Sequence, residues 1–320
     1  MPKVNMVQAI NLALKEEMQR DKSVVILGED VGKDGGVFRI TEGLIEQFGT
    51  ERVMDTPLSE SGIVGAAVGM AIYGLKPVAE IQFMGFIYPT IDQLFSHAAR
   101  IRSRSRGRFT CPIVVRTPYG AGIKALELHS ESTEALFCHM PGIKVVVPSS
   151  PYNAKGLLIS SIRDPDPVIF LESTRLYRLI KEDVSEEEYT LPLGSARIVQ
   201  EGKDVTLIAW GSMLHRVLQS VEGVDAEVID LMTLSPFDEE TVYKSVKKTG
   251  RVVIVHEAPK TCGFGAELSA SIAEEAMLYL KAPILRVTGY DVVMPLPKFE
   301  DYYMPSVERI RKAIEEVMKY

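Results

Sequence analysis

The chain has 320 residues, of which 46% are hydrophobic and 25% are charged, and its formal net charge is −7. This length suits two domains, and the composition is that of an ordinary soluble globular protein. The acidic balance argues against general nucleic-acid binding, which needs a basic surface, and no apolar run reaches the roughly 20 residues of a membrane span.

The first element that the sequence predicts is a helix near the N-terminus. Residues 1–18 carry apolar side chains at helical spacing and two glutamates, a pattern unlike a signal or transit peptide. The three cysteines, Cys111, Cys138 and Cys262, are far apart and form no CxxC pair. This usage suits a reducing compartment and gives no zinc site, so we expect a cytoplasmic protein.

Short apolar strands and helical stretches then alternate through the first half of the chain. Strand patterns occur at residues 23–30, 52–55, 77–83, 112–118, 144–150 and 167–173. Helical patterns occur at 41–49, 61–74, 91–101 and 152–162. Strands separated by helices predict a largely parallel sheet that is covered on both faces.

The alternation fades from about Thr174 to Lys203. The acidic segment at residues 181–195 contains proline and predicts a linker. Strand patterns resume at residues 204–212, 226–234, 251–258 and 282–289. We therefore predict an α/β protein with two doubly wound domains, residues 1–190 and residues 191–320.

Several common catalytic motifs are absent from the sequence. It contains no GxxxxGK[ST] loop, no GxGxxG after a strand, no GxSxG and no HExxH. Its five histidines are too dispersed to indicate a metal site. The usual nucleotide, hydrolase and metalloprotease interpretations therefore receive no support.

One long motif covers residues 28–86, GEDVGKDGGVFRITEGLIEQFGTERVMDTPLSESGIVGAAVGMAIYGLKPVAEIQFMGF. Further motifs follow in order, among them YPTIDQLFSHAAR, VVRTPYG, ELHSES, HMPGIKVVVPSSPYNAKGLL, RDPDPVIFLE, HEAPKTCGFGAEL and VTGYDVVMPLP. Over nearly its whole length, the chain resembles the beta subunit of thiamine-diphosphate-dependent 2-oxoacid dehydrogenases. This resemblance implies a pyrimidine-binding domain followed by a transketolase C-terminal-like domain.

The resemblance also implies partners. In that family an alpha subunit binds the diphosphate of thiamine diphosphate through Mg²⁺, and the beta subunit holds the aminopyrimidine ring. The alpha motif begins with GDG, which does not occur in this chain. The chain therefore resembles half of an active site in a tetramer of two alpha and two beta subunits, which serves a lipoyl acyltransferase core. Asp291 and the C-terminal region are candidates for docking that core, whose small binding domain is basic in relatives.

Glu60 matches the glutamate that the family places against a ring nitrogen of the aminopyrimidine. A buried carboxyl with a raised pKa would suit the exchange of a proton there. Ser59 could cap the helix that follows, and a helix N-terminus would instead favour the charged carboxylate. On the residues alone, Glu60 could equally be a surface glutamate in the first turn.

The same resemblance assigns other residues to the site. Phe86 would stack on the aminopyrimidine ring, and Gln82 and Leu58 would lie beside it, although Phe86 alone could be a core residue. Glu29 would be a partner of Glu60 or an intersubunit contact. His129 would assist proton transfer while the acyl group passes to lipoamide, and a loop histidine alone is usually just solvated.

Glu131 follows His129 where the family commonly has glutamine, and it could raise the pKa of His129. Family members also suggest a structural K⁺ site. Its possible ligands are Cys111, Ile113, Ser161, Asp164 and Asp166.

A glycine-rich helix follows Glu60. Gly62, Gly65 and Gly69 each cost roughly 1 kcal/mol in a helix interior, which close helix packing would offset. In the family this helix meets a second beta subunit, and packing against the chain's own sheet is the alternative.

The expected reaction is oxidative decarboxylation of a 2-oxoacid with acyl transfer to a lipoyl group. The segments EIQF and SPYNAKGLL are slightly nearer to branched-chain members than to pyruvate members. Two alternatives stay open: another thiamine-dependent transfer, such as acetoin cleavage or a split transketolase, and a noncatalytic scaffold.

Overall fold

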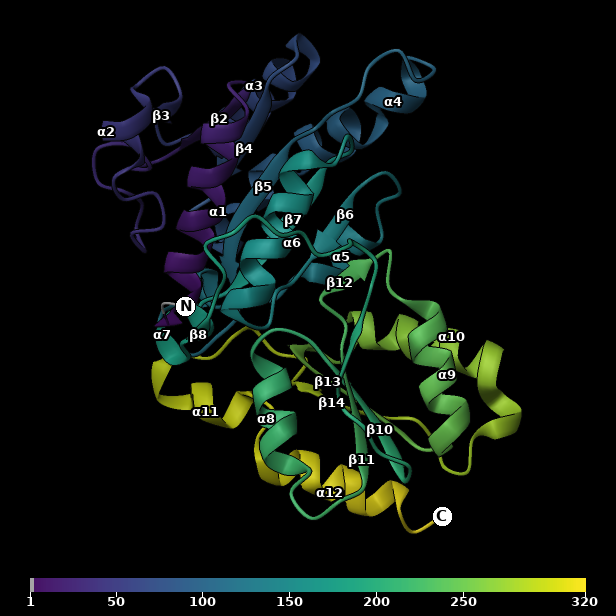
Figure 1. The fold of residues 1–320 in the computed structure, drawn as a ribbon. Coiled ribbons are helices and arrows are strands. Elements are labelled where there is room, and N and C mark those ends of the chain that lie inside the picture. The colour runs from purple at the N-terminus through teal and green to yellow at the C-terminus, as the bar shows by residue number, and fades with distance from the viewer. Residues whose placement is uncertain (1–2) are drawn as a thin grey trace.

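The chain folds into two α/β domains, seen one above the other in Figure 1. This computed structural model describes residues 3–320; residues 1 and 2, with which the predicted first domain begins, lie outside the described residues. A seven-stranded sheet has the order β12-β6-β7-β5-β4-β2-β3, and a five-stranded sheet has the order β14-β13-β10-β11-β9. The predicted fold class is confirmed.

The first sheet is parallel except at one edge. Its parallel strands are β2 (Val24–Gly28), β3 (Val53–Asp55), β4 (Lys76–Glu80), β5 (Val114–Tyr119), β6 (Lys144–Val146) and β7 (Val168–Ser173). The edge strand β12 (Thr233–Ser235) pairs antiparallel with β6, and β1 (Lys3–Val4) pairs with β8 (Glu182–Asp183) in a separate ribbon. The central strands are buried on both faces, which explains their nearly continuous apolar sequence.

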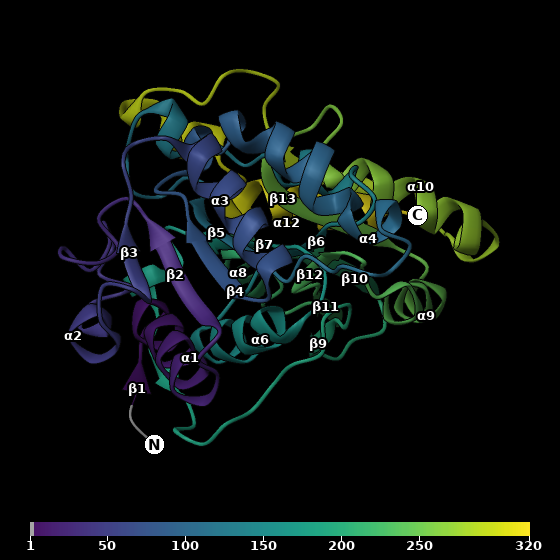
Figure 2. The ribbon, with the colours of Figure 1, turned by 90° about the horizontal axis from the view of Figure 1, so that it is seen from above.

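Helices cover both faces of this sheet. Figure 2 shows α1 (Met6–Arg20) and α6 (Pro151–Arg163) together on one side and α3 (Glu60–Tyr73) on the other. Shorter helices are α2 (Leu44–Phe48), α5 (Glu134–Cys138) and α7 (Leu176–Leu179). The predicted helix at residues 91–101 is helical throughout but not a regular α-helix. A π-helical turn at Asp92–His97 and a 3-10 turn at Ala98–Arg100 precede α4 (Ile101–Arg104).

The second sheet is also doubly wound. Its strands are β9 (Arg197–Gln200), β10 (Val205–Ala209), β11 (Ala226–Asp230), β13 (Val252–Pro259) and β14 (Leu285–Gly289). Its helices are α8 (Ser212–Ser220), α9 (Glu239–Thr249), α10 (Phe264–Ala276), α11 (Glu300–Tyr303) and α12 (Val307–Val317). The boundary expected at residue 190 stays a prediction, and it falls between the last parallel strand of the first sheet and β9.

The sequence suggested a single strand at residues 226–234, but these residues do not form one strand. Met232 has a φ of 54°, which turns the chain between β11 and β12. Strand β11 belongs to the second sheet, and β12 belongs to the first sheet. A segment of the second half thus ties the two domains together.

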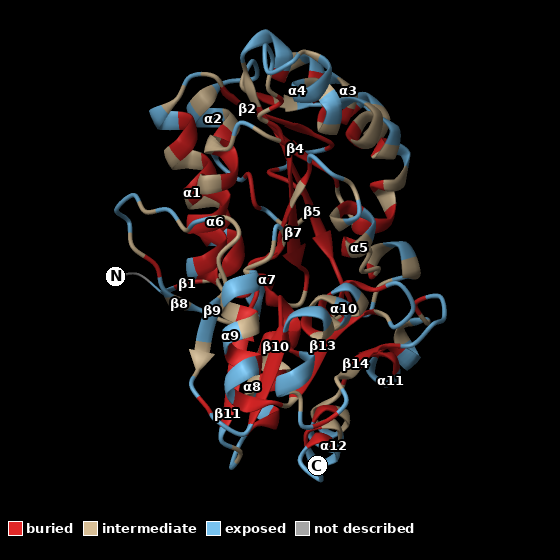
Figure 3. Ribbon diagram, turned by 90° about the vertical axis from the view of Figure 1, so that its right-hand side faces the viewer, coloured by how far each residue is buried: buried red, intermediate tan, exposed pale blue. Residues whose placement is uncertain are grey.

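The domains also share an apolar core. Figure 3 shows the strands of both sheets buried and the outer faces of the helices exposed. One cluster of buried side chains runs from Val64 in α3 to Trp210 and Phe264 in the second domain. Such a continuous core favours a fixed arrangement of the two domains. No helix within residues 3–320 is long and apolar enough to cross a bilayer.

Candidate active site

Polar residues gather where β2 and β4 end. Gly28 and Glu80 are register partners in this parallel pair, so the residues that follow them meet at the same sheet edge. Gln82 donates a hydrogen bond from Nε2 to Oδ2 of Asp30 at 3.0 Å. Glu29 is only 9% exposed, and its buried Oε1 has no hydrogen-bond partner among the described residues. An unpaired buried oxygen at a sheet edge marks a place for a ligand or water.

Glu60 faces this edge from the first turn of α3. Its side chain is half-buried, and burial together with the nearby charge of Glu60 raises the pKa of Glu29. The two carboxyls predicted as partners are therefore close enough to interact. Ser59 occupies the N-cap position, but its side chain makes no cap hydrogen bond, so the expected cap is absent.

Aromatic rings form a wall beside the carboxyls. The His129 ring lies 4.2 Å from the Phe83 ring and 5.2 Å from the Phe86 ring, measured between centroids. The two phenylalanines meet edge to face at 5.7 Å. Gly85 allows this approach, because a Cβ there would lie 2.6 Å from the Leu128 carbonyl oxygen. The resemblance pointed to Phe86 and His129 but did not assign Phe83 to the site.

His129 ends a 3-10 turn at Glu127–His129 and is half-buried. Its Nδ1 is buried and has no hydrogen-bond partner in the described chain. Glu131, the expected influence on His129, instead accepts a hydrogen bond from the Tyr88 hydroxyl. Burial and this contact with Glu131 raise the pKa of Tyr88.

The cluster is open on one side. Leu58, two residues before Glu60, is 81% exposed although it is apolar. A flat heteroaromatic ring could stack on the phenylalanines while a carboxyl shares a proton with one of its nitrogens. The arrangement therefore suits half of a pocket that another surface completes.

A cluster of buried charged side chains lies within the first sheet. The Arg116 guanidinium donates to Glu172 and to Glu80, each at 2.7 Å, and Tyr177 donates to Glu172 at 2.7 Å. Burial alone would lower the pKa of Arg116, but the charges of Glu172 and Glu80 raise it. Charged residues inside apolar strands were the only sequence signal for this cluster.

The proposed potassium ligands come together only in part. Cys111 donates its N–H to the carbonyl of Pro165, and Ser161 accepts the N–H of Asp164 at 3.3 Å. However, Lys144 Nζ lies 2.7 Å from Oδ1 of Asp164, and Arg102 Nε lies 2.6 Å from Asp166. Both carboxylates already have a cationic partner, so this geometry does not favour K⁺ there. Among the described residues, no three or more His, Cys, Asp or Glu side chains are grouped to hold a metal ion.

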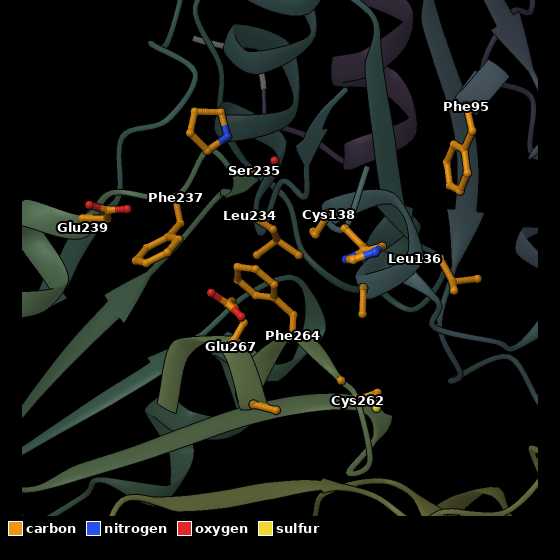
Figure 4. A pocket seen from close by; sticks show the side chains of 15 residues that line it. Phe95, Leu136, Cys138, Leu234, Ser235, Phe237, Glu239, Cys262, Phe264 and Glu267 are labelled. Carbon is orange, nitrogen blue, oxygen red and sulfur yellow. The ribbon is translucent and has the colours of Figure 1, made fainter. Parts of the chain in front are cut away.

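A separate cavity of about 690 Å³ lies between α5, β12 and α10. Figure 4 shows Leu234, Phe237 and Phe264 gathered beside it, and the rings of Phe237 and Phe264 are 6.1 Å apart. None of the candidate site residues lines this cavity. The carboxyl–aromatic cluster, which combines acid–base groups with a flat apolar wall, is the better candidate site.

In the second domain, His256 is buried and Asp291 is exposed. The His256 ring stacks on Trp210 at 5.3 Å, and burial lowers the pKa of His256 to about 3. A neutral, stacked histidine suits a structural role. Asp291 accepts hydrogen bonds from the N–H and hydroxyl of Thr261, which lower its pKa.

Two family models match the chain. The "Transketolase, pyrimidine binding domain" matches residues 2–180, and the "Transketolase, C-terminal domain" matches residues 194–310. The chain is similar to the "Pyruvate dehydrogenase E1 component subunit beta" of Acholeplasma laidlawii, with 51% identity over 99% of this chain and 98% of that protein. It is 48% identical to the "2-oxoisovalerate dehydrogenase subunit beta" of Bacillus subtilis, over 98% of each chain.

The pyruvate dehydrogenase beta subunit of Bacillus subtilis is 47% identical over the full length of both chains. Among solved structures, the chain is similar to a "Split gene transketolase, inactive beta4 tetramer", with a TM-score of 0.80. That match covers 99% of both chains at 21% identity, so it bears on the fold alone.

Proposed function

We propose, because the chain belongs to the family of 2-oxoacid dehydrogenase beta subunits, that it forms the aminopyrimidine half of a thiamine diphosphate site. The reaction is the oxidative decarboxylation of a 2-oxoacid, with transfer of the acyl group to a lipoyl group. The bound cofactor supplies the electron sink that decarboxylation needs. The observation that carries the proposal is the pair of carboxyls, Glu60 and Glu29, beside an aromatic wall at an open sheet edge.

Each residue of the cluster has a part in this proposal. Glu60 shares a proton with a ring nitrogen, and Glu29, whose pKa is raised by burial and by the charge of Glu60, lies close to Glu60. Phe86 and Phe83 offer flat apolar faces to the ring, and Gln82 is a polar neighbour. His129, whose Nδ1 has no partner within the described chain, moves a proton at the entrance during acyl transfer.

An alpha subunit completes the site and carries Mg²⁺ with the diphosphate. Support comes from exposed apolar side chains around the open edge, beginning with Leu58. A second group of exposed apolar residues lies near the His129 loop, at Val292, Val293, Leu296 and Phe299. Apolar surface of this extent is typical of a protein interface. Potassium is left out of the proposal, because Lys144 and Arg102 already neutralise its carboxylate ligands.

A second beta subunit packs on α3 in this proposal. Gly62, Ala66, Gly69 and Tyr73 form one exposed strip along the helix, so these small residues do not pack on the chain's own sheet. A Cβ at Gly69 would meet nothing within 4 Å. Small outward residues allow close approach of another helix, which favours a tetramer of two alpha and two beta subunits. A lipoyl acyltransferase core is the third partner, with the region of exposed Asp291 as its candidate docking surface.

The test is reconstitution with an alpha subunit that carries the GDG motif. Decarboxylation is measured with pyruvate, 2-oxoisovalerate, acetoin and sugar phosphates, with and without thiamine diphosphate. We expect cofactor-dependent activity with a 2-oxoacid, and a loss of about 10²–10⁴-fold in Glu60→Gln, which cannot exchange the proton. Unchanged decarboxylation in this variant would defeat the catalytic assignment of Glu60. Activity with acetoin or sugar phosphates alone would redirect the substrate class, and no cofactor-dependent activity with any of them would favour a scaffold.

A further inference from the structure

The loop that carries His129 is held from the other domain. Residues 120–129 follow β5 of the first domain, yet their backbone contacts two carboxyls of the second. Ala121 donates its N–H to Oε2 of Glu257 at 2.9 Å, and Lys124 donates its N–H to Oε2 of Glu300 at 3.0 Å. Glu257 in β13 and Glu300 in α11 are each only 2% exposed. Two buried side chains of the second domain thus fix the course of a loop of the first.

The loop lies directly on Glu257. A Cβ at Gly120 would be 2.6 Å from Oε2 of Glu257, so only glycine lets the backbone come this close. Gly120 and Gly122 both have positive φ, 81° and 120°, and bend the chain over the carboxyl. By contrast, Ile123 and Leu126 farther along the loop are exposed. The start of the loop is therefore its best-anchored part.

Glu257 is matched to donors on both sides. Oε1 accepts the Ser212 hydroxyl at 3.0 Å while Oε2 accepts the Ala121 N–H. A carboxylate can accept both bonds, whereas the amide of glutamine has a single acceptor oxygen. Because the Ser212 hydroxyl can also accept, glutamine could keep both contacts, whereas methionine, of similar length, removes both acceptor oxygens.

We propose that Glu257 is a positioning residue that anchors the His129 loop, so that the second domain sets where His129 stands over Phe83 and Phe86. The second domain thereby takes part in acyl transfer without touching the cofactor. This inference rests on the proposed function for the role of His129, but the anchoring itself does not depend on activity. It gives the second domain a task at a site that the first domain builds.

Proteolysis tests the anchor on the full-length chain. Lys124 is the only lysine or arginine in residues 120–133, and its side chain is 64% exposed. We expect Glu257→Met to speed tryptic cleavage after Lys124 by about tenfold or more, because cleavage follows local opening. In the reconstituted complex, the same variant lowers the rate of acyl transfer to a lipoyl domain relative to the rate of decarboxylation, by about tenfold.

Asp230→Asn is the matched control. Asp230 is 1% exposed and lies in the same sheet, and it bonds Ser149 and Asn153 of the first domain without touching the loop. We expect it to leave both the Lys124 cleavage rate and the ratio of acyl transfer to decarboxylation at their wild-type values. Equal effects of Asp230→Asn and Glu257→Met would overturn the proposal, since they would reflect a general loosening of the domain contact.

Gly120→Ala disturbs the same contact from the loop side and replaces Glu257→Met as the test if that variant does not fold. Its Cβ displaces the loop from an unchanged Glu257, so faster cleavage and a lower acyl-transfer ratio are again expected. Wild-type cleavage and a wild-type ratio in both variants would refute the anchor. A wild-type complex without any decarboxylation would instead count against the proposed function, and the cleavage rates would still decide the anchor.

Discussion

The two domains share one architecture but use the same edge of their sheets differently. In the first domain, the carboxyl ends of β2 and β4 are open and carry Glu29 and Gln82, with Glu60 facing them. In the second domain, the ends of β11 and β13 carry Asp230 and Glu257, which are buried against the first domain. This edge is where doubly wound sheets place ligands. Whether it binds a ligand or another domain depends on what covers it.

The two regions also treat buried charge differently. Within the first sheet, Glu80 and Glu172 share the Arg116 guanidinium. Asp230 and Glu257 have no cation within 4 Å among the residues described, and burial raises the pKa of each to about 7. The Arg116 cluster neutralises its buried acids with a guanidinium, whereas the contact between the domains holds Asp230 and Glu257 near protonation.

We expect the largest effect on stability from removing the cation of the Arg116 cluster. Arg116→Met leaves two carboxyls buried without a cation, which should lower the free energy of unfolding by about 3–5 kcal/mol. Urea unfolding of the full-length chain measures this. Arg102→Met is the control, because its pair with Asp166 is partly exposed, and we expect a much smaller change in the free energy of unfolding. Similar losses in the two variants would contradict the distinction.

The buried carboxyls without a cation, Asp230 and Glu257, predict that the free energy of unfolding depends on pH. The pKa of Asp230 rises from 3.8 to about 7 on folding, so between these values the folded chain binds more protons than the unfolded chain. The contribution to the free energy of unfolding is therefore complete below about pH 4 and is lost as the pH rises to about 7, at about 1.4 kcal/mol per pH unit. Asp230→Asn should make the decline between about pH 5.5 and about pH 7.5 shallower than in wild type. Equal slopes in urea unfolding would show that Asp230 is ionised throughout this range.

The sequence predicted the open sheet edge of the first domain better than the covered sheet edge of the second domain. Periodic apolar patterns gave the two α/β domains, and the place of Gln82 at the C-terminal end of a predicted strand pointed to the open edge, whereas Glu29 came from the resemblance alone. The resemblance supplied Glu60, Phe86 and His129, and the structure brings them to that edge together. Such predictions succeed where local pattern and strand direction are enough.

The missed features all depend on contacts between distant segments. Residues 226–234 have the pattern of one strand, but the turn at Met232 sends its two halves to different sheets. The aromatic wall needs Phe83 to meet a loop more than 40 residues away. The hydrogen bond from Ala121 to Glu257 spans 136 residues, and no local pattern encodes it. Burial of His256 and Glu257 likewise follows from how the domains meet.

A smaller effect concerns the aromatic faces that distinguish the open edge. Phe86→Leu keeps an apolar side chain but removes the ring face, so we expect a three- to tenfold rise in the KM for thiamine diphosphate, about 0.5–1.5 kcal/mol. Steady-state kinetics of the reconstituted complex measure it. Phe264→Leu alters a buried ring of the second domain and should leave this KM unchanged. A rise in both variants would point to general loosening of the fold.

The smallest effect concerns the outward strip of α3, on the open side of the first domain. In the isolated chain Gly69→Ala adds a methyl group into free space within a helix, which should raise the free energy of unfolding by roughly 0.5–1 kcal/mol. Gly65→Ala should gain less, because its Cβ would lie 3.3 Å from Oε1 of Gln93. In the assembled enzyme we expect Gly69→Ala to destabilise the tetramer instead. The added methyl group would keep apart two helices that must pack closely. Urea unfolding measures the stability of the isolated chain, and sedimentation measures the stability of the tetramer. A gain that persists in the tetramer would show that α3 faces solvent there, and the open region of this chain would then be limited to the edge that carries Glu60.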